Sequence, residues 1–340
     1  MSPAVSVILP THNRAHLLKR AVVSVLCQLS EQDELIVVDD GSTDNTREVL
    51  DEFKDRIRYV RTPGLGAGAA RNTGVRKASN PLVAFIDSDD EWLPGKMEIQ
   101  RAFMAAMPDI LFCFTNFSFR EAEELGGTHK HFNLVSWSKD FRSWDEILAP
   151  GQKISTIIDL PAGFEDFMFH VGSMCVQELC ANYINVNTLV VRREEAGDAL
   201  YFAEDTHTYE DWECFGRLAC AGKAAYLHFE SACQHSHGGP RLTDAHVTEC
   251  ARARVKILPR VWGADKEFLQ EYGEIYQRIL DEERLTLLDG LLVRGETEEA
   301  RQHLRQIKCP VSLARKFLAT LPGGITRNLL TLRRKIKNVI

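Results

Sequence analysis

The first 90 residues alternate between short strand-like apolar runs and helical patterns, and this alternation constrains the fold more than any other feature. The expected strands are 5–9, 35–38, 57–60 and 82–86, and the expected intervening helices are 14–29, 47–53 and 69–77. A strand–helix–strand order gives parallel strands whose crossing helices cover the sheet. We therefore expect an α/β fold with a mostly parallel, twisted sheet and helices on both faces.

Polar clusters follow three of these strands directly, at 11–13, 39–44 and 87–90. In open α/β sheets, ligands bind in the crevice outside the carboxyl ends of the strands. The three clusters are therefore expected to meet at one edge of the sheet. This convergence predicts a binding site there.

The pattern changes along the rest of the chain. A segment at 187–191 is expected to rejoin the sheet, followed by a helix at 209–221 and a strand at 224–229. Beyond about residue 240 the pattern is helical, at 268–280, 284–293 and 298–307. We expect an α/β domain over 1–240 and a helical C-terminal region over 241–340.

Composition excludes several classes of protein. A net charge of −7 argues against a general nucleic-acid binder, which needs a basic surface. No apolar run is long enough to span a membrane, and the first residues lack the basic and apolar parts of a signal peptide. Nine irregularly spaced cysteines indicate reduced thiols and a cytoplasmic protein.

The acidic turn at 87–90 is the most informative local feature. Asp87, Asp89 and Asp90 crowd three carboxylates at a strand end, where they repel one another unless a cation neutralises them. Oxygen ligands favour a hard ion such as Mg²⁺ or Mn²⁺, which also binds diphosphates. The alternative is a solvated acidic turn that caps the helix near Trp92.

Two further features allow both a structural and a functional interpretation. Asp40, in the sequence Asp-Asp-Gly-Ser, either belongs to a turn with a helix N-cap or binds a nucleoside base or ribose. The glycines of the 64–68 loop either let a ligand approach, with Arg71 meeting a phosphate or base, or form a flexible loop. In the second case Arg71 pairs with a neighbouring acid.

An acidic residue and two histidines later in the chain also allow two interpretations each. Asp211 either interacts with the dipole of the helix that it begins or accepts a proton from an attacking hydroxyl group. His235 and His237 either supply one nitrogen ligand to a metal ion or lie on the surface.

Five motifs closely resemble those of family 2 glycosyltransferases of the GT-A fold. They read VSVILPTHNR at 5–14, VVDDGSTD at 37–44, AARNTG at 69–74, FIDSDD at 85–90 and EDWE at 210–213. The resemblance covers roughly residues 3–240. It implies an inverting enzyme that moves a sugar from a nucleoside-diphosphate-sugar, a UDP-sugar foremost, to a hydroxyl group of a glycan or lipid-linked acceptor.

The resemblance also implies a role for individual residues. The nucleoside would be held by Pro10, Thr11, Asn13 and Asp40, the rest of the donor by Arg71 and Asp87, and the divalent metal by Asp89, Asp90 and His237, with Asp211 as the base. One departure concerns the late histidine, because Gln234-His235 stand where many members have Tyr-Arg. The choice between His235 and His237 therefore stays open.

Two other functional classes were weighed. A dinucleotide-dependent oxidoreductase needs a glycine-rich turn after its first strand, whereas residues 10–13 contain no glycine. A non-catalytic sugar-nucleotide-binding protein remains an alternative, although it would have no need for the acid at Asp211. The acceptor is expected to contact the irregular segment at 116–183.

The C-terminal tail is strongly basic and contains regularly spaced apolar residues. Residues 311–340 include no acidic residue and seven basic ones: Arg315, Lys316, Arg327, Arg333, Arg334, Lys335 and Lys337. The tail could form basic amphipathic helices at an anionic membrane, which would place the protein at the inner face of that membrane. Alternatively, it packs on the catalytic domain and presents a solvated basic face.

Overall fold

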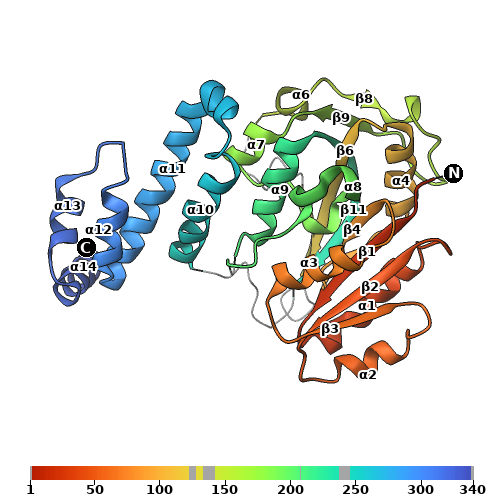
Figure 1. Ribbon diagram of the computed structural model, residues 1–340, viewed down its shortest axis with the longest axis horizontal. Coiled ribbons are helices and arrows are strands. Elements are labelled where there is room, and N and C mark those ends of the chain that lie inside the picture. Colours follow the sequence, from red (N-terminus) through yellow and green to blue (C-terminus); the bar gives the residue numbers. More distant parts are fainter. Residues whose placement is uncertain (1, 122–127, 133–141, 207, 237–245, 338–340) are drawn as a thin grey trace. The chain divides into compact units, whose positions relative to one another are not determined.

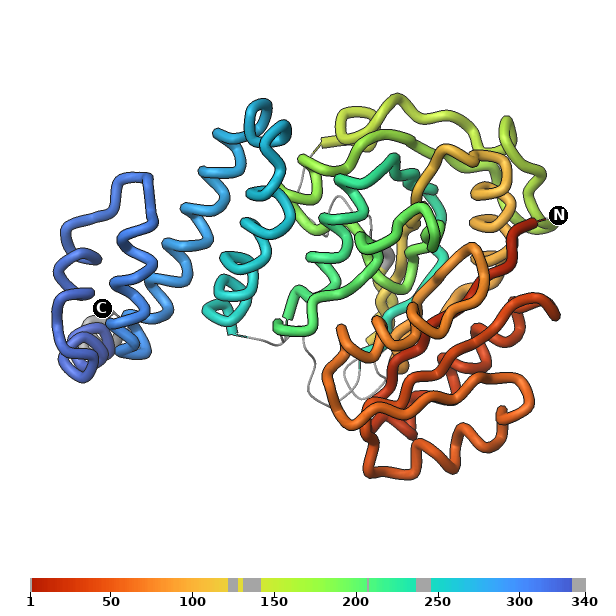
Figure 2. Tube along the Cα trace, viewed as in Figure 1, coloured from red at the N-terminus to blue at the C-terminus, as the bar shows by residue number. Residues whose placement is uncertain are grey.

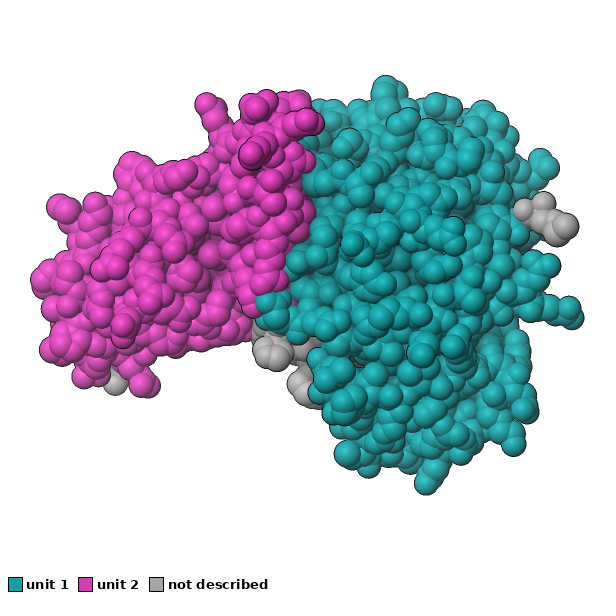
Figure 3. Space-filling model, in the orientation of Figure 1, with its two compact units in different colours: residues 1–205, 210–239 teal, residues 206–209, 240–340 magenta. Residues whose placement is uncertain are grey.

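The computed structural model describes residues 2–121, 128–132, 142–206, 208–236 and 246–337. The chain divides into two compact units (Figure 3). The first comprises residues 1–205 and 210–239, and the second comprises 206–209 and 240–340.

The first unit is built on one sheet of eleven strands within the described residues (Figure 1). The strands are β1 Val5–Thr11, β2 Glu34–Asp40, β3 Arg58–Thr62, β4 Leu82–Phe85, β5 Glu91–Trp92, β6 Ile110–Arg120, β7 His129–Phe132, β8 Gln152–Lys153, β9 Met168–Gly172, β10 Val190–Arg192 and β11 Lys223–His235. The main path runs β3-β2-β1-β4-β10-β6-β11-β9-β8, with β5 on β11 and β7 on β6.

The N-terminal half of the sheet is parallel, as the sequence predicts. β1 pairs in parallel with both β2 and β4, and every residue of β1 is buried. A strand covered on both faces needs apolar side chains in both directions, which is why VSVIL reads as a continuous run rather than an alternation. The expected α/β architecture, with a largely parallel sheet, is confirmed.

The helices of this unit connect the strands and pack on the sheet; α3, for example, packs against β1 and β2, and α4 against β6. They are α1 Ala15–Leu26, α2 Thr46–Asp51, α3 Ala67–Lys77, α4 Lys96–Ala106, α6 Trp144–Ile147, α7 Cys175–Cys180, α8 Arg193–Ala196 and α9 Glu210–Ala221. Short 3-10 helices cover Ile154–Thr156, Val186–Thr188 and Gly197–Leu200.

Two features of the sheet differ from the sequence-based expectation. β10 enters antiparallel between β4 and β6, so the middle of the sheet is mixed. β11 extends well beyond the expected 224–229, because it pairs with β6 along nearly its whole length, with three shifts in register. β6 itself was not predicted.

The second unit is helical and has its own apolar core. Its helices are α10 Val247–Val261, α11 Lys266–Arg294, α12 Thr297–Leu304, α13 Leu313–Thr320 and α14 Gly323–Lys337 (Figure 2). Its core residues are Ala251, Leu287, Leu288, Leu291, Leu292, Ala300 and Ala319. Within the described part of the chain, no helix is long and apolar enough to cross a membrane.

The expected break between helices at 280 and 284 is wrong, because α11 runs through it. Asp281, the first residue of the expected break, is only 3% exposed. Its carboxylate accepts the backbone N–H groups of Lys308 (3.1 Å) and Cys309 (2.9 Å), so its charge is satisfied by a loop far along the chain. α11 instead begins at the N-cap Asp265 and ends at Gly295, whose φ is 79°.

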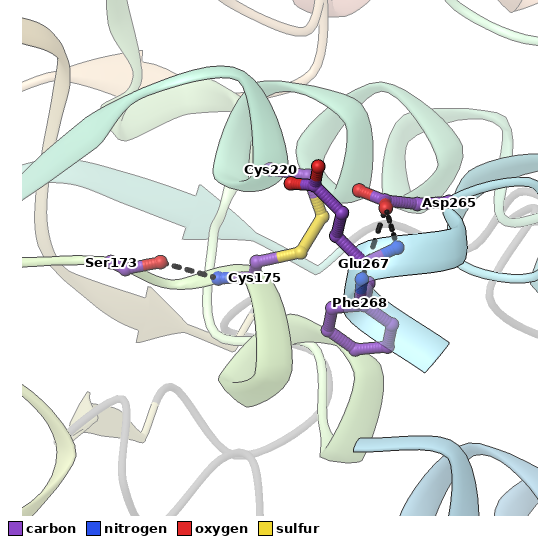
Figure 4. Close-up of a disulfide and its surroundings, with 6 residues drawn as sticks. All are labelled: Ser173, Cys175, Cys220, Asp265, Glu267 and Phe268. Atoms are coloured by element: carbon purple, nitrogen blue, oxygen red, sulfur yellow. Dashed lines mark hydrogen bonds between the residues drawn. A yellow bond between two sulfur atoms is a disulfide. The ribbon is translucent and has the colours of Figure 1, made fainter. Parts of the chain in front are cut away.

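A disulfide joins Cys175 of α7 to Cys220 of α9 (Figure 4). The expectation that the cysteines are all reduced is therefore wrong for this pair. The two residues are 45 positions apart and belong to no spacing motif. They meet because α7 and α9 pack together, which brings their Cα atoms to 4.5 Å.

Candidate active site

Asn13 joins the loops that follow β1 and β2. Its φ of 52° is in the left-handed region, which Asn tolerates better than most residues. The side-chain Oδ1 accepts the N–H groups of Thr43 (2.8 Å) and Asp44 (3.3 Å), and the Asn13 N–H donates to Ser42 Oγ (3.0 Å). Two of the polar clusters expected to converge are thus held together.

The end of β1 lies directly beside this junction. Pro10 and Thr11 are both buried, and Thr11 pairs with Asp39 across the strands. Thr11 Oγ1 is buried without a hydrogen-bond partner among the described residues. A buried hydroxyl of this kind is costly unless something else satisfies it.

Asp40 organises the glycine-containing loop before α3. Its Oδ1 accepts the Thr62 hydroxyl (2.6 Å) and the Leu65 N–H (2.8 Å), while Oδ2 accepts the Gly66 N–H (2.7 Å). Asp40 is only 5% exposed, and Gly66, the residue before α3, has a φ of 96°. The carboxylate therefore fixes the loop and the start of the helix, and the loop is not a flexible connection.

The neighbouring Asp39, at the end of β2, is fully buried and accepts the Ser42 N–H. Burial by itself raises the pKa of Asp39, but hydrogen bonds from Ser42 and from Tyr59, assisted by Arg61, outweigh it and hold that pKa below its ordinary value. Asp39 is thus kept as a carboxylate that fixes the turn after β2.

Arg71, on α3, bridges two acids from separate parts of the chain. Its guanidinium donates to Asp87 Oδ1 (2.7 Å), in the turn after β4, and to Glu210 Oε1 (3.0 Å), at the start of α9. Arg71 is 5% exposed and also lies over the Phe202 ring. Burial disfavours its charge, but Asp87 and then Glu210 more than compensate, so the pKa of Arg71 is raised and it stays charged.

The same helix docks on the segment that leads to α9. Asn72 donates to the Phe202 carbonyl (2.9 Å) and to Glu204 (2.8 Å), and its Oδ1 accepts the Phe202 N–H (2.7 Å). Gly68 is required there because a Cβ would lie 2.1 Å from the carbonyl oxygen of Ala203. α3 therefore positions the start of α9.

Asp211 lies in the first turn of α9, next to Glu210. Burial, then the charge of Glu210, raises the pKa of Asp211 to about 7, although Arg71 acts in the opposite direction. Tyr209, which precedes the helix, has a φ of 62°, an unusual conformation for a bulky residue. A carboxyl group with a pKa near neutrality is suited to accept and release protons.

Glu178, on α7, is a second acid beside this helix. It is fully buried, and its backbone carbonyl accepts the indole N–H of Trp212 (3.0 Å). Its Oε1 accepts the Tyr183 N–H (3.0 Å), whereas Oε2 has no partner among the described residues. Burial raises the pKa of Glu178 to about 8, and the charge of Asp211 adds to the rise.

The acidic turn after β4 separates its three carboxylates into different environments. Asp90 is 4% exposed. Its carboxylate oxygens accept the backbone N–H of His235 (3.1 Å) and the side-chain N–H of Asn187 (2.7 Å). Burial, then the charges of Asp89 and Asp87, raises the pKa of Asp90 well above its ordinary value. Asp90 thus holds the turn to the sheet, while Asp89 is more exposed and its backbone carbonyl accepts from Arg20.

Of the two histidines considered as metal ligands, His235 lies within the described residues. His235 Nε2 lies 3.0 Å from Glu91 Oε2, on the edge formed by β5 and β11. His237 lies outside the described residues. Among the residues that the structure describes, no group of three or more His, Cys, Asp or Glu side chains is arranged to hold a metal ion.

Hydrogen bonds and shared elements thus join Asp40, Arg71, Asp87 and Asp211 into one continuous region. Asp40 fixes the start of α3, Arg71 extends from α3 to Asp87 and Glu210, and Glu210 adjoins Asp211. Three contributors were not predicted from the sequence: Glu210 as a partner of Arg71, Asn187 as a donor to Asp90, and Glu178. Only the EDWE motif hinted at Glu210.

Residues 6–166 match the sequence model of glycosyl transferase family 2. The chain is 41% identical over 137 residues to the Escherichia coli UDP-Glc:alpha-D-GlcNAc-diphosphoundecaprenol beta-1,3-glucosyltransferase WfgD, covering 40% of this chain and 54% of the relative. It is 47% identical over 92 residues to the validoxylamine A glucosyltransferase of Streptomyces hygroscopicus, covering 25% and 22%. The chain thus spans about half or less of the length of these curated relatives.

Solved structures share the fold at low sequence identity. TarS 1-349 of S. aureus, in complex with UDP-GlcNAc, has a TM-score of 0.57 and 17% identity, and the match covers 88% of this chain and 78% of TarS. The mannosyltransferase PcManGT from Pyrobaculum calidifontis, in complex with GDP-Man and Mn²⁺, has a TM-score of 0.53 and 16% identity, covering 98% and 88%. The solved structures share the GT-A type fold, and residues 6–166 of the chain belong to glycosyl transferase family 2.

Proposed function

We propose that this chain is an inverting glycosyltransferase in which Asp211 is the general base. The observation that carries the proposal is the position of Asp211 at the start of α9, next to Glu210, which Arg71 joins to the turn after β4. A base that works at neutral pH needs a pKa near that pH, and the pKa of Asp211 is raised to about 7.

The proposed step is a single displacement. Asp211 takes the proton of an acceptor hydroxyl group as its oxygen forms a bond to the anomeric carbon of the donor. The bond from that carbon to the diphosphate oxygen breaks at the same time, and the nucleoside diphosphate leaves with the electron pair. Holding the two reactants in line supplies much of the rate enhancement.

The donor would lie along the rim formed by the loops after β1 and β2. We assign the nucleoside to the 10–13 and 40–44 loops, where the buried hydroxyl of Thr11 has no hydrogen-bond partner within the described part of the chain. Asp87 would contact the ribose or sugar. Because Arg71 is occupied by Asp87 and Glu210, we assign it the task of fixing Asp87 and the helix of Asp211, not of binding a phosphate directly.

We infer that a divalent metal ion would be held by Asp89 and by oxygens of the donor diphosphate. Mg²⁺ is commonly bound through one or two carboxylates plus substrate phosphates, so a site with few protein ligands fits this donor set. Both oxygens of Asp90 are engaged within the protein, which leaves it a supporting role. When bound, the ion would supply positive charge to stabilise the leaving diphosphate.

The donor and acceptor classes follow from the named relatives. A UDP-sugar is proposed because WfgD is named for UDP-Glc and the TarS structure contains UDP-GlcNAc, while GDP-Man in PcManGT is the competing choice. A lipid-linked glycan is the proposed acceptor, since WfgD is named for GlcNAc-diphosphoundecaprenol.

The test compares wild-type protein with Asp211→Asn. We expect the variant to bind UDP-sugar with unchanged affinity but to transfer sugar at least about a thousandfold more slowly, on the scale of losing a proton acceptor. Asp198→Asn, at an exposed acid, is the matched control. Equal turnover by wild-type and Asp211→Asn would remove Asp211 from the mechanism, and donor binding without turnover by the wild type would favour a non-catalytic sugar-nucleotide-binding protein.

A further inference from the structure

Exposed apolar side chains are concentrated at the C-terminal end of the second unit. Eight large apolar residues are exposed among the described residues, and half of them lie within 313–329. We call these four the tail surface: Leu313 (83% exposed), Phe317 (61%), Ile325 (50%) and Leu329 (45%). Single exposed apolar residues need no explanation, but such a concentration on neighbouring helices does.

The spacing places these residues on one side of each helix. Leu313 and Phe317 are four positions apart on α13, and Ile325 and Leu329 are four apart on α14, so each pair shares a helix face. The two helices are consecutive and are joined by a hydrogen bond from the Thr326 hydroxyl to the Leu318 carbonyl (3.0 Å).

The tail surface is not the side that holds these helices to the unit. α13 buries Ala319 and partly buries Leu318 against the core around Leu291, and α14 contributes Leu330. Arg315 donates two hydrogen bonds to the Asp289 carboxylate of α11 (2.7 and 2.6 Å), which also hold α13 to the unit. The helices are therefore fixed on the helical unit itself, and each leaves a second pair of large apolar side chains exposed to water.

The positive charge of the tail indicates what kind of surface would bind these exposed apolar residues. The tail at 311–340 has seven basic residues and no acidic one, in a chain whose net charge is −7, so the remainder of the chain carries −14. Lys316 and Arg327, from α13 and α14, are exposed alongside the apolar residues. An apolar face combined with a local excess of positive charge fits a surface that is both apolar and anionic.

We propose that the tail surface binds an anionic lipid bilayer, with its apolar side chains in the headgroup and acyl boundary and its basic side chains on the lipid phosphates. A second copy of this chain that docks tail to tail fits less well, because it would bring two strongly basic tails together. The proposal goes beyond sugar transfer, and it does not depend on the activity assigned to Asp211.

The experiment is sedimentation of the full chain with vesicles of neutral phosphatidylcholine and with vesicles in which about a third of the lipid is anionic phosphatidylglycerol. We expect at least about tenfold stronger partitioning onto the anionic vesicles at about 0.1 M salt, most of it lost at about 0.5 M. Phe317→Gln with Leu313→Gln should reduce partitioning at least about fivefold, and so should Lys316→Gln with Arg327→Gln.

Val247→Gln is the matched control, since Val247 is 59% exposed on α10, outside the tail. It should partition like the wild type. Equal partitioning of wild type on neutral and anionic vesicles, or no effect of either double variant, would overturn the proposal. Light scattering that shows a dimer lost in the Leu313/Phe317 variant, without vesicle binding, would overturn it in favour of self-association.

Binding of soluble UDP-sugar is measured in parallel on every variant. It should be unchanged, because the substituted residues lie in the second unit. If a variant loses vesicle binding but binds the donor normally, the defect lies in the tail. If the wild type does not bind the donor, the result contradicts the proposed function and leaves the membrane proposal unaffected.

Discussion

Arg71 and Glu210 are 139 residues apart in the sequence, yet they form a buried ion pair of 3.0 Å. The same guanidinium holds Asp87 at 2.7 Å, so one cation satisfies two acids at the centre of the candidate active site. Because Glu210 precedes Asp211 directly, Arg71 couples the turn after β4 to the start of α9, which carries the proposed base.

Replacing Arg71 with alanine should destabilise the fold and abolish transfer. The substitution leaves two acids close together without a compensating charge, a change that costs about 3–5 kcal/mol for a buried pair. Chemical denaturation measures this cost. Arg76→Ala, on the same helix but about half exposed, is the control and should change stability by less than about 1 kcal/mol. A similar loss for both variants would contradict the central role of Arg71.

The rate of transfer should depend on pH through Asp211. Burial and the charge of Glu210 raise its pKa to about 7, and a general base works only when it is deprotonated. We expect kcat/KM to fall about tenfold per pH unit below that pKa and to level off above it. Glu210→Gln removes a charge that raises the pKa, so its residual activity should show the acidic limb at lower pH. A wild-type limb near the ordinary Asp pKa would be inconsistent with this environment.

Lys96 should make the protein less stable at neutral pH than an apolar residue at the same position would. It is fully buried, it donates to Gln100 Oε1 (2.6 Å), and burial lowers its pKa to about 7. The unfolded chain therefore binds more protons than the folded one between about pH 7 and the ordinary lysine pKa, and stability should rise with pH across that window.

The test of Lys96 is its replacement with methionine. Lys96→Met should remove the rise in stability with pH and stabilise the protein at pH 7 by about 1–3 kcal/mol, the loss of the hydrogen bond to Gln100 offsetting part of the gain. Lys54→Met, at an exposed position, should leave the pH dependence as it is. An unchanged slope in Lys96→Met would assign the pH dependence to other groups.

Reducing the Cys175–Cys220 disulfide should loosen α9, which carries Asp211. The bond closes a loop of 45 residues, and loop-closure entropy predicts a loss of about 3–4 kcal/mol in the free energy of unfolding when it is removed. Thermal denaturation of Cys175→Ser/Cys220→Ser should reproduce the effect of reductant on the wild type. Cys27→Ser, at an exposed free thiol, is the control, and reductant should have no further effect on the double variant.

Local sequence patterns predicted the elements of the first 90 residues because each depends on near neighbours. β1 is a continuous apolar run and α1 has apolar residues at a period of 3.6, and a linear sequence displays both patterns directly. The parallel order then places Asp40 and Asp87 at the same edge of the sheet. That edge, and the family, could be predicted from the motifs.

Tertiary structure decided which of these side chains meet and in what ionisation state. Asn187 reaches Asp90 across 97 residues, Cys175 reaches Cys220, and Asp281 is satisfied by a distant loop that keeps α11 whole. No local period encodes such contacts, because they form only when separate elements pack and exclude water. Desolvation in that packed interior, together with neighbouring charges, raises the pKa values of Asp211 and Asp90. The sequence therefore identified the acidic residues, whereas the tertiary structure determined how readily each one is protonated.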